Sequence, residues 1–190
     1  MYNKEYKGDV CSHTHSFFLD NIFRRLLQNP VKIVGEYIKK GNIAIDLGCG
    51  PGYFSIDMAK MVGGSGKVLA VDLQKEMLEK TRKKAQTLCL EDRMVFHNCP
   101  QDRIGLSADI KADFILAFYM VHETPDPEKF LSEVKGLLKP RGKFLLVEPA
   151  FHVSKKQFQE IARNIEKIGF TSLGSPPKKG GRSLLLTVRD

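Results

Sequence analysis

The feature that most restricts the fold is a run of glycines directly behind a short apolar segment. Residues 42–54 are NIAIDLGCGPGYF, in which Gly48, Gly50 and Gly52 occupy alternate positions. The apolar part is β-branched and breaks at glycine, as a buried strand does where it enters a turn. Residues 53–62 follow at once with apolar side chains at helical spacing. The sequence therefore predicts a strand, a glycine turn and a helix in succession, the beginning of a parallel α/β unit.

The same alternation continues to the end of the chain. Further strands are predicted at 67–73, 93–98, 112–119 and 143–149, with helices at 75–88, 127–138 and 154–169. Residues 170–174 and 183–188, on either side of the segment SPPKKGGR, predict a closing antiparallel hairpin. This order of elements predicts right-handed crossovers and a mostly parallel sheet with helices on both faces.

Two further helices are predicted before the first strand, at residues 16–27 and 31–40. Their apolar faces can be buried only against the rest of the domain, so we expect them to cover a pocket. We expect one domain over residues 1–190, with an N-terminal segment and cap helices at 1–40 and a Rossmann-like core at 41–190.

Composition and charge narrow the class of protein. No apolar run approaches the ~20 residues that cross a bilayer, and the start MYNKEYKGD is too polar for a secretory signal, so we expect a cytoplasmic protein without a membrane partner. The net charge of +8 comes from lysines and arginines spread along the chain, which favours a solvated surface over a nucleic-acid patch without excluding one. The four cysteines form no C-x-x-C pair and are expected to be reduced thiols.

The glycine spacing distinguishes between two kinds of adenosine-bearing ligand. A dinucleotide fingerprint, G-x-G-x-x-G, requires its third glycine at the position of Tyr53. The chain instead has D-x-G-x-G-x-G, beginning at Asp46, and this acidic turn favours a cationic ligand over a pyrophosphate. The spacing thus argues against a nicotinamide-dependent oxidoreductase. Asp72 ends the next predicted strand, where an acid can accept hydrogen bonds from a ribose diol.

Taken together, AIDLGCGPGYFSIDMA and GKVLAVDLQKEML resemble the first glycine motif and the following acidic motif of the class I S-adenosylmethionine-dependent methyltransferases. Residues 112–123, 130–149 and the terminal hairpin are also similar to that family, so the resemblance extends over residues 40–188. It implies S-adenosylmethionine as the cofactor and S-adenosylhomocysteine as the product. It also implies a doubly wound sheet of seven strands, mostly parallel with an antiparallel last strand.

The resemblance further implies a set of cofactor-binding residues: Asp46, Gly48, Cys49, Gly50, Gly52, Asp72, Leu73, Cys99, Gln101, Ala117 and Phe118. In the family pattern the glycine turn wraps the methionine part of the cofactor, Asp72 holds the ribose and Leu73 flanks the adenine. The backbone of Ala117 and Phe118 approaches the methionyl amine, which Asp46 helps to orient.

The adenine edge departs from this pattern. Many relatives carry a short Gly-Asp-Ala type segment after the third strand, where this chain has NCPQD over residues 98–102. We therefore expect Cys99, Gln101 or Asp102 to take over the contact with the adenine.

Four side chains at the carboxyl ends of the fourth and fifth predicted strands are candidates for chemistry: His122, Glu123, Glu148 and His152. We choose His122 and Glu148 as catalytic candidates, because oxygen or protonated nitrogen acceptors need a base near the operating pH. A structural role for His122 is the alternative. For the two glutamates, the alternatives are capping and the orientation of a cationic substrate.

A segment near the N-terminus alternates thiol and imidazole side chains, with Cys11, His13 and His15 in CSHTHS. Metal sites of this kind usually contain a tight C-x-x-C or H-x-x-x-H pair, which is missing, so we expect no metal. A lid over the cofactor is another interpretation. The role of these three residues stays open.

The sequence favours a small-molecule acceptor. A single domain leaves no separate unit for a polymer, and FYMVHE replaces the Asn-Pro-Pro-aromatic motif of many exocyclic-amine methyltransferases. Methylation of RNA or protein, which the basic charge favours, is the second hypothesis. A third is a protein that binds S-adenosylmethionine without catalysis. The sequence does not decide between a monomer and a homodimer.

Overall fold

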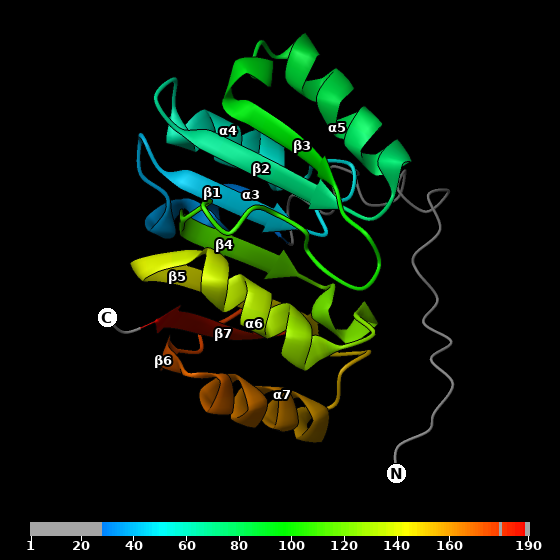
Figure 1. Ribbon diagram of the computed structural model, residues 1–190, viewed down its shortest axis with the longest axis vertical. Coiled ribbons are helices and arrows are strands. Elements are labelled where there is room, and N and C mark those ends of the chain that lie inside the picture. The colour runs from blue at the N-terminus through cyan, green and yellow to red at the C-terminus, as the bar shows by residue number, and fades with distance from the viewer. Residues whose placement is uncertain (1–27, 179, 189–190) are drawn as a thin grey trace.

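The computed structural model describes residues 28–178 and 180–188. Seven strands form one sheet in the order β3-β2-β1-β4-β5-β7-β6 (Figure 1). The strands are β1 (Ile43–Leu47), β2 (Lys67–Asp72), β3 (Met94–Asn98), β4 (Ala112–Phe118), β5 (Leu138–Pro149), β6 (Phe170–Gly174) and β7 (Gly181–Val188). β7 runs antiparallel to both of its neighbours, and the other neighbouring strands are parallel. The predicted sheet and its antiparallel last strand are confirmed.

The helices in the described part of the chain are α3 (Pro30–Val34), α4 (Ser55–Val62), α5 (Lys75–Thr87), α6 (Pro127–Leu137) and α7 (Lys155–Ile168). Short 3₁₀ turns are η2 (Gly35–Tyr37), η3 (Glu91–Arg93) and η4 (Val121–Glu123). Local signals begin and end these helices. Asp126 caps α6, Ser154 and Gln157 form a capping box at α7, and Gly169 ends α7 in the left-handed conformation. None of the described helices is long and apolar enough to span a membrane.

Helices cover both faces of the sheet, as predicted. In Figure 1, α6 and α7 lie in front of the sheet, and α3 and α4 lie behind it. Successive residues of a strand point to opposite faces, so each strand contributes to both cores. On β4, Phe114 and Leu116 join the core that contains α4, whereas Ile115 and Ala117 join the core that contains α6.

The structure differs from the prediction at two boundaries. The helix expected at 31–40 is replaced by α3 and η2, after which Ile38 adopts an extended conformation. Beyond Ile38, the Lys39 backbone N–H donates a hydrogen bond of 2.7 Å to Oδ1 of Asn42. β5 begins earlier than expected, at Leu138, and its first part is separated from the rest by a shift in register against β4. The helix predicted at 16–27 lies outside the described residues. The second helix of the expected pocket cover, present as α3 and η2, packs its apolar side chains into the core that contains α4.

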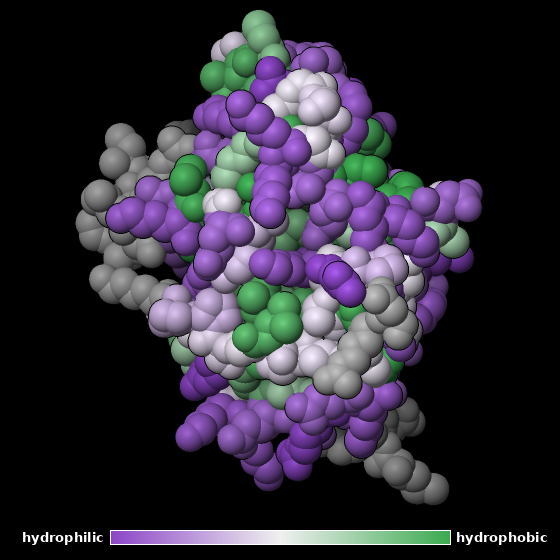
Figure 2. Space-filling view, turned by 90° about the vertical axis from the view of Figure 1, so that its left-hand side faces the viewer, coloured by the Kyte–Doolittle hydropathy of each residue, from purple (hydrophilic) through white to green (hydrophobic). Residues whose placement is uncertain are grey.

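The strand order brings several loops together at one edge of the sheet. From β1 the chain runs outward through β2 to β3 and then returns to β4 on the opposite side of β1. The carboxyl ends of β1, β2 and β4 therefore meet where the winding changes direction, which is where open α/β sheets bind ligands. At the opposite edge, where these strands begin, the surface is largely hydrophilic (Figure 2).

Candidate active site

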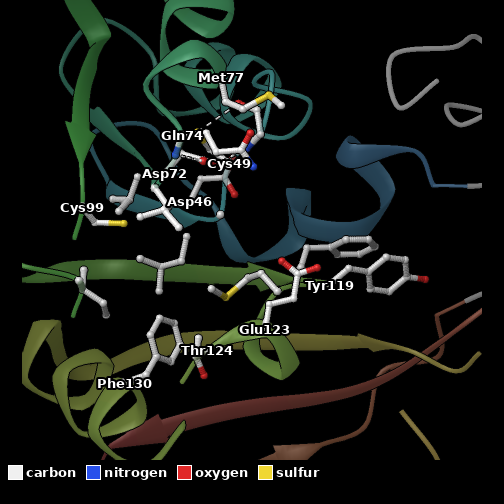
Figure 3. Close-up of a pocket in the computed structure, with 18 of the residues that line it drawn as sticks. Asp46, Cys49, Asp72, Gln74, Met77, Cys99, Tyr119, Glu123, Thr124 and Phe130 are labelled. Atoms are coloured by element: carbon white, nitrogen blue, oxygen red, sulfur yellow. Dashed lines mark hydrogen bonds between the residues drawn. The ribbon is translucent and has the colours of Figure 1, made fainter. Parts of the chain in front are cut away.

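A cavity of about 330 Å³ lies at the carboxyl edge of the sheet (Figure 3). Its volume is within the range of small-molecule sites, roughly 300–1,000 Å³. Segments that follow β1, β2, β3, β4 and β5 all contribute to its wall. Nine of the predicted cofactor residues line it: Asp46, Gly48, Cys49, Gly50, Asp72, Leu73, Cys99, Gln101 and Phe118. The fold thus gathers residues that are distant in sequence around one space.

The turn after β1 has a left-handed backbone at each glycine. Gly48, Gly50 and Gly52 have φ angles of +67°, +53° and +80°, a region that side chains disfavour. A Cβ atom at Gly50 would meet nothing within 4 Å, whereas one at Gly48 would lie 3.0 Å from Met120. The missing side chain at Gly50 therefore leaves open space in which a ligand can approach the backbone.

Gly52 and Ala117 are the two predicted cofactor residues that do not line the cavity. A Cβ atom at Gly52 would lie 2.6 Å from Cγ2 of Thr81, so this glycine allows the turn to pack against α5. Ala117 is fully buried, and its side chain belongs to the core on the α6 side of the sheet. At the end of β4 it is Phe118 that reaches the cavity.

Asp72 ties the ends of the first two strands together. Its Oδ2 accepts a hydrogen bond of 2.8 Å from the Gly50 N–H, and its Oδ1 accepts one of 2.8 Å from the Gln74 N–H. Burial raises the pKa of this carboxyl group, and the hydrogen bonds from Gln74 and Gly50 oppose the rise. Each carboxylate oxygen has a second acceptor position, so Asp72 can hold the turn and still accept hydrogen bonds from a ligand diol.

Asp46 and Cys49 lie deep in the turn. Asp46 is buried and accepts a hydrogen bond from the hydroxyl of Ser55 at the start of α4. Burial raises the pKa of the Cys49 thiol well above its ordinary value, and the charges of Asp46 and Asp72 add to the effect. A thiol that stays protonated is a poor nucleophile, so Cys49 acts as a small packing residue.

The residues predicted to contact the adenine form the part of the cavity wall that follows β2 and β3. Leu73 is partly exposed and lines the cavity with Cys99 and Gln101. Burial raises the pKa of Cys99 to about 11. The Asp102 carboxylate is 3.2 Å from Nζ of Lys129, and this hydrogen bond lowers the pKa of Asp102. The ion pair makes Asp102 less available to a ligand than Gln101.

His122 and Glu148 form a hydrogen-bonded pair on the β4–β5 side of the cavity. His122 lies in η4, and Glu148 lies near the end of β5. Nδ1 of His122 is 2.5 Å from Oε2 of Glu148, and the His122 backbone N–H donates to Oε1 at 3.3 Å. The Glu148 side chain is 0% exposed, whereas that of His122 is 19% exposed and lines the cavity. The two predicted catalytic residues are therefore in contact, with Glu148 behind the ring.

Opposing influences act on the pKa of His122. Burial lowers it, but the hydrogen bond and charge of Glu148, with the charge of Glu123, outweigh burial and raise the pKa above its ordinary value. The Glu148 carboxylate also favours the tautomer with its proton on Nδ1. In that tautomer Nε2 is able to accept a proton from a bound molecule.

Several apolar residues of the wall were not predicted from the sequence. Met77, Met120, Phe130 and Phe151 come from four different segments and all line the cavity. Phe151 is 76% exposed and packs edge-on against His152, with 4.6 Å between ring centroids. An apolar residue at a cavity looks the same in sequence as one in the core. The one available signal was the place of Phe151, two residues after the end of a predicted strand and next to the candidate histidine His152.

Within the described residues, no group of three or more His, Cys, Asp or Glu side chains is arranged to hold a metal ion. Cys11, His13 and His15 lie outside the described part of the chain. The expectation that the protein has no metal site therefore stays a prediction.

The glycine turn suits an adenosyl sulfonium better than a pyrophosphate. Tyr53, at the position of the third dinucleotide glycine, is buried, and its hydroxyl donates to the Gln28 carbonyl at 2.8 Å. A side chain therefore occupies the place where a dinucleotide-binding helix needs glycine for close packing. Asp46 and Asp72 add negative charge, which attracts a cation and repels phosphate.

Comparisons with known proteins agree with this geometry. Residues 38–174 match the family model described as "Methyltransferase domain". A solved SAM dependent methyltransferase from Aquifex aeolicus is 26% identical with a TM-score of 0.82, and the match covers 93% of this chain and 98% of that one. The "Ubiquinone/menaquinone biosynthesis C-methyltransferase UbiE" of Haemophilus ducreyi is 27% identical over 92% of this chain and 62% of its own length. A demethylmenaquinone methyltransferase of Staphylococcus aureus (strain JH9) is 30% identical over 80% of this chain and 61% of its own length.

The fold and the acidic glycine turn define a class I S-adenosylmethionine-dependent methyltransferase domain. The chain belongs to the methyltransferase domain family, whose model matches residues 38–174. It spans about three fifths of the length of these two curated relatives, 62% of one and 61% of the other.

Proposed function

We propose that this chain catalyses the transfer of a methyl group from S-adenosylmethionine to a small-molecule acceptor. The observation that carries the proposal is that one cavity is lined by the glycine turn, by Asp72 and by the ring of His122. The residues expected to bind the cofactor and the candidate base therefore face the same space. Such an arrangement can align a nucleophile with the group that it attacks.

The proposed binding roles are those that the family resemblance implies, and they are compatible with the place of these residues in the cavity wall. Asp72 accepts hydrogen bonds from the ribose hydroxyls, Gly50 lets the backbone approach the methionine part, and Asp46 orients the amino group. When bound, the cofactor supplies a methyl group on a positively charged sulfur, which is already activated for displacement. The protein therefore has mainly to position and desolvate the acceptor.

His122 is the residue that we assign to proton removal. Glu148 is fully buried behind the ring and accepts a hydrogen bond from Nδ1, so it acts as a positioning residue that does not touch the acceptor. The Nε2 atom then receives the proton that the acceptor loses. A positioned base of this kind contributes roughly 10²–10⁴-fold to the rate.

A small molecule is the acceptor class that the cavity supports best. About 330 Å³ has to hold the donor and the reacting part of the acceptor, so a compact group is the one that reaches His122. Two relatives are named as methyltransferases of ubiquinone/menaquinone biosynthesis and of demethylmenaquinone. These names support a small acceptor without identifying it for this chain.

Calorimetry on the full chain tests the cofactor assignment. S-adenosylmethionine and S-adenosylhomocysteine are expected to bind, and NADH is not. Asp72→Ala should weaken the binding of S-adenosylhomocysteine by about 1–3 kcal/mol, the scale for hydrogen bonds to a charged group. Asp92→Ala, at an exposed position, is the control and should leave affinity unchanged. If neither adenosyl compound binds at millimolar concentration, the proposal is wrong.

Turnover is tested by following S-adenosylhomocysteine production with a panel of small acceptors, and with RNA and protein as contrasts. Small acceptors are expected to be methylated, and His122→Gln should slow the reaction by roughly 10²–10⁴-fold without weakening cofactor binding. Cofactor binding without turnover on any acceptor would instead support a non-catalytic binding protein.

A further inference from the structure

The cavity is acidic although the chain as a whole is basic. The chain contains 30 lysines and arginines against 22 aspartates and glutamates. Among the described residues that line the cavity, Arg103 is the one lysine or arginine. Five lining residues are acidic: Asp46, Asp72, Asp102, Glu123 and Asp126. This local reversal of charge favours cationic or hydrogen-bond-donating ligands over anionic ones.

Four of the five carboxylates accept hydrogen bonds from the protein: Asp46, Asp72, Asp102 and Asp126. In the described part of the chain, the carboxylate of Glu123 accepts none. Burial raises the pKa of Glu123, the charge of Glu148 adds to this, and His122 opposes it. The Glu123 side chain is 35% exposed and lines the cavity, so a ligand that enters can donate a hydrogen bond to this carboxylate in place of water.

One ligand atom can contact the side chains of Glu123 and His122 at the same time. Oε1 of Glu123 is 3.9 Å from Nε2 of His122. Hydrogen bonds join heavy atoms about 2.7–3.2 Å apart, so the two side chains do not bond directly, but one nitrogen or oxygen can lie about 2.9 Å from both. In Figure 3 the Glu123 carboxylate points into the cavity, toward the side from which Asp46, Cys49 and Asp72 project.

We infer that Glu123 is a specificity-determining residue that, together with His122, holds an acceptor whose nucleophilic nitrogen or oxygen carries a proton. The inference rests on the proposed function and names its substrate class, an amine or a hydroxyl compound. A carboxylate or phosphate acceptor is repelled, because Glu123 can offer it only a negative charge.

In the proposed step the acceptor gains a methyl group and gives up one proton to the protein. Before the reaction, the proton of the acceptor atom is shared between Oε1 of Glu123 and Nε2 of His122. As the acceptor atom forms its bond to the methyl carbon, the carbon–sulfur bond breaks and its electron pair stays on sulfur. The acceptor's proton passes to Nε2 of His122.

Sinefungin allows a test that does not depend on knowing the acceptor. In this analogue a carbon bearing an ammonium group replaces the methylsulfonium, so its positive N–H donors point to where the methyl group leaves. The wild type should bind sinefungin more tightly than S-adenosylhomocysteine. In Glu123→Gln the ratio of these two affinities should be roughly tenfold smaller. The affinity for S-adenosylhomocysteine should not change. Glu128→Gln, at an exposed position of α6, is the matched control and should behave as the wild type.

The outcomes separate this inference from the proposed function. If Glu123→Gln binds sinefungin and S-adenosylhomocysteine in the same ratio as the wild type, Glu123 does not face the reacting atoms and the inference is wrong, while the cofactor assignment stands. If the wild type binds neither compound, the proposed function fails.

Aromatic amines, phenols and benzoates, compared in the S-adenosylhomocysteine assay, distinguish the two acceptor types. Mass spectrometry of the product locates the new methyl group. N-methylation of an amine or O-methylation of a phenol that Glu123→Gln slows by at least about tenfold supports the inference, and methylation at carbon overturns it. Methylation of a benzoate at a rate that Glu123→Gln leaves unchanged overturns it. If no compound of the panel is methylated, the inference is judged by the affinity for sinefungin relative to S-adenosylhomocysteine, compared between the wild type and Glu123→Gln.

Discussion

Oε2 of Glu148 lies 2.5 Å from Nδ1 of His122, across 26 positions of the sequence. The contact exists because β4 and β5 are neighbours in the sheet, with Phe118 paired to Val147. Glu148 follows that last pair, and the turn η4 closes over it. A fully buried carboxylate therefore determines which nitrogen of a cavity-lining imidazole carries the proton.

Replacing Glu148 with glutamine should lower the pKa of His122. The variant loses the hydrogen bond and the charge that raise this pKa, while the burial that lowers it remains. Turnover should also fall, because the amide N–H₂ group disfavours the tautomer that leaves Nε2 able to accept a proton. An NMR titration of the His122 ring, assigned from its loss in His122→Gln, measures the shift. An unchanged pKa would show that the pair does not form in solution.

Replacing Glu123 with glutamine should raise the free energy of unfolding near neutral pH. Burial raises the folded-state pKa of Glu123 above about 4.3, the ordinary value of a glutamate, so ionisation disfavours the folded state. This penalty does not exist below the unfolded-state pKa and is complete once the pH exceeds the folded-state pKa. The stability gained should therefore be small at about pH 4 and largest at about pH 7. Urea unfolding at both pH values measures the gain in stability, with Glu128→Gln as the control. If the wild type is as stable as Glu123→Gln at neutral pH, the prediction is wrong.

Alanine at Gly50 and at Gly52 should have different main effects. Both glycines have positive φ, so either substitution costs about 1–2 kcal/mol of backbone strain. At Gly52 the new Cβ would also lie 2.6 Å from Cγ2 of Thr81, so Gly52→Ala should lower the melting temperature more. Gly50→Ala meets no protein atom within 4 Å and should mainly weaken the binding of S-adenosylhomocysteine.

A second substitution checks the cause of this difference. Thr81→Ser removes the Cγ2 atom, so it should restore part of the stability of Gly52→Ala and none of that of Gly50→Ala. Thermal unfolding and calorimetry on the single and double variants measure both effects. Equal losses of stability at the two glycines would contradict the packing role of Gly52.

The described cysteines should react with iodoacetamide in the order of their thiolate content and exposure. Cys89 is exposed, whereas burial raises the pKa of Cys99 to about 11 and that of Cys49 well above its ordinary value. The thiolate is the reactive form, so Cys89 should be alkylated first. S-adenosylhomocysteine should slow the modification of Cys49 and Cys99, which line the cavity, and leave Cys89 unaffected. Peptide mass spectrometry follows each site, and protection of Cys89 to the same degree would contradict this location of the ligand.

The order of strands and helices and the acidic glycine turn could be predicted from the amino-acid sequence. The alternation of strands and helices, the acidic turn at Asp46 and the carboxylate of Asp72 are visible because they depend on residues a few positions apart. Nine of the residues that the family resemblance predicts to bind the cofactor line the cavity. The boundaries of the elements were harder to predict. The helix expected at 31–40 ends early, and the Lys39 N–H donates to the Asn42 side chain, a contact that apolar periodicity does not reveal.

Which side chains share the cavity depends on how the strands pack in the folded protein. The sequence pattern does not show that β4 turns the side chain of Ala117 into the core on the α6 side of the sheet, whereas Phe118 lines the cavity. The pairing of Glu148 with His122, and the 3.9 Å between His122 and Glu123, depend on the order and register of β4 and β5 and on the turn η4. Local propensities act over a few residues, whereas such contacts form only when strands distant in sequence lie side by side, so the chemistry of the site is settled by the packing of the sheet.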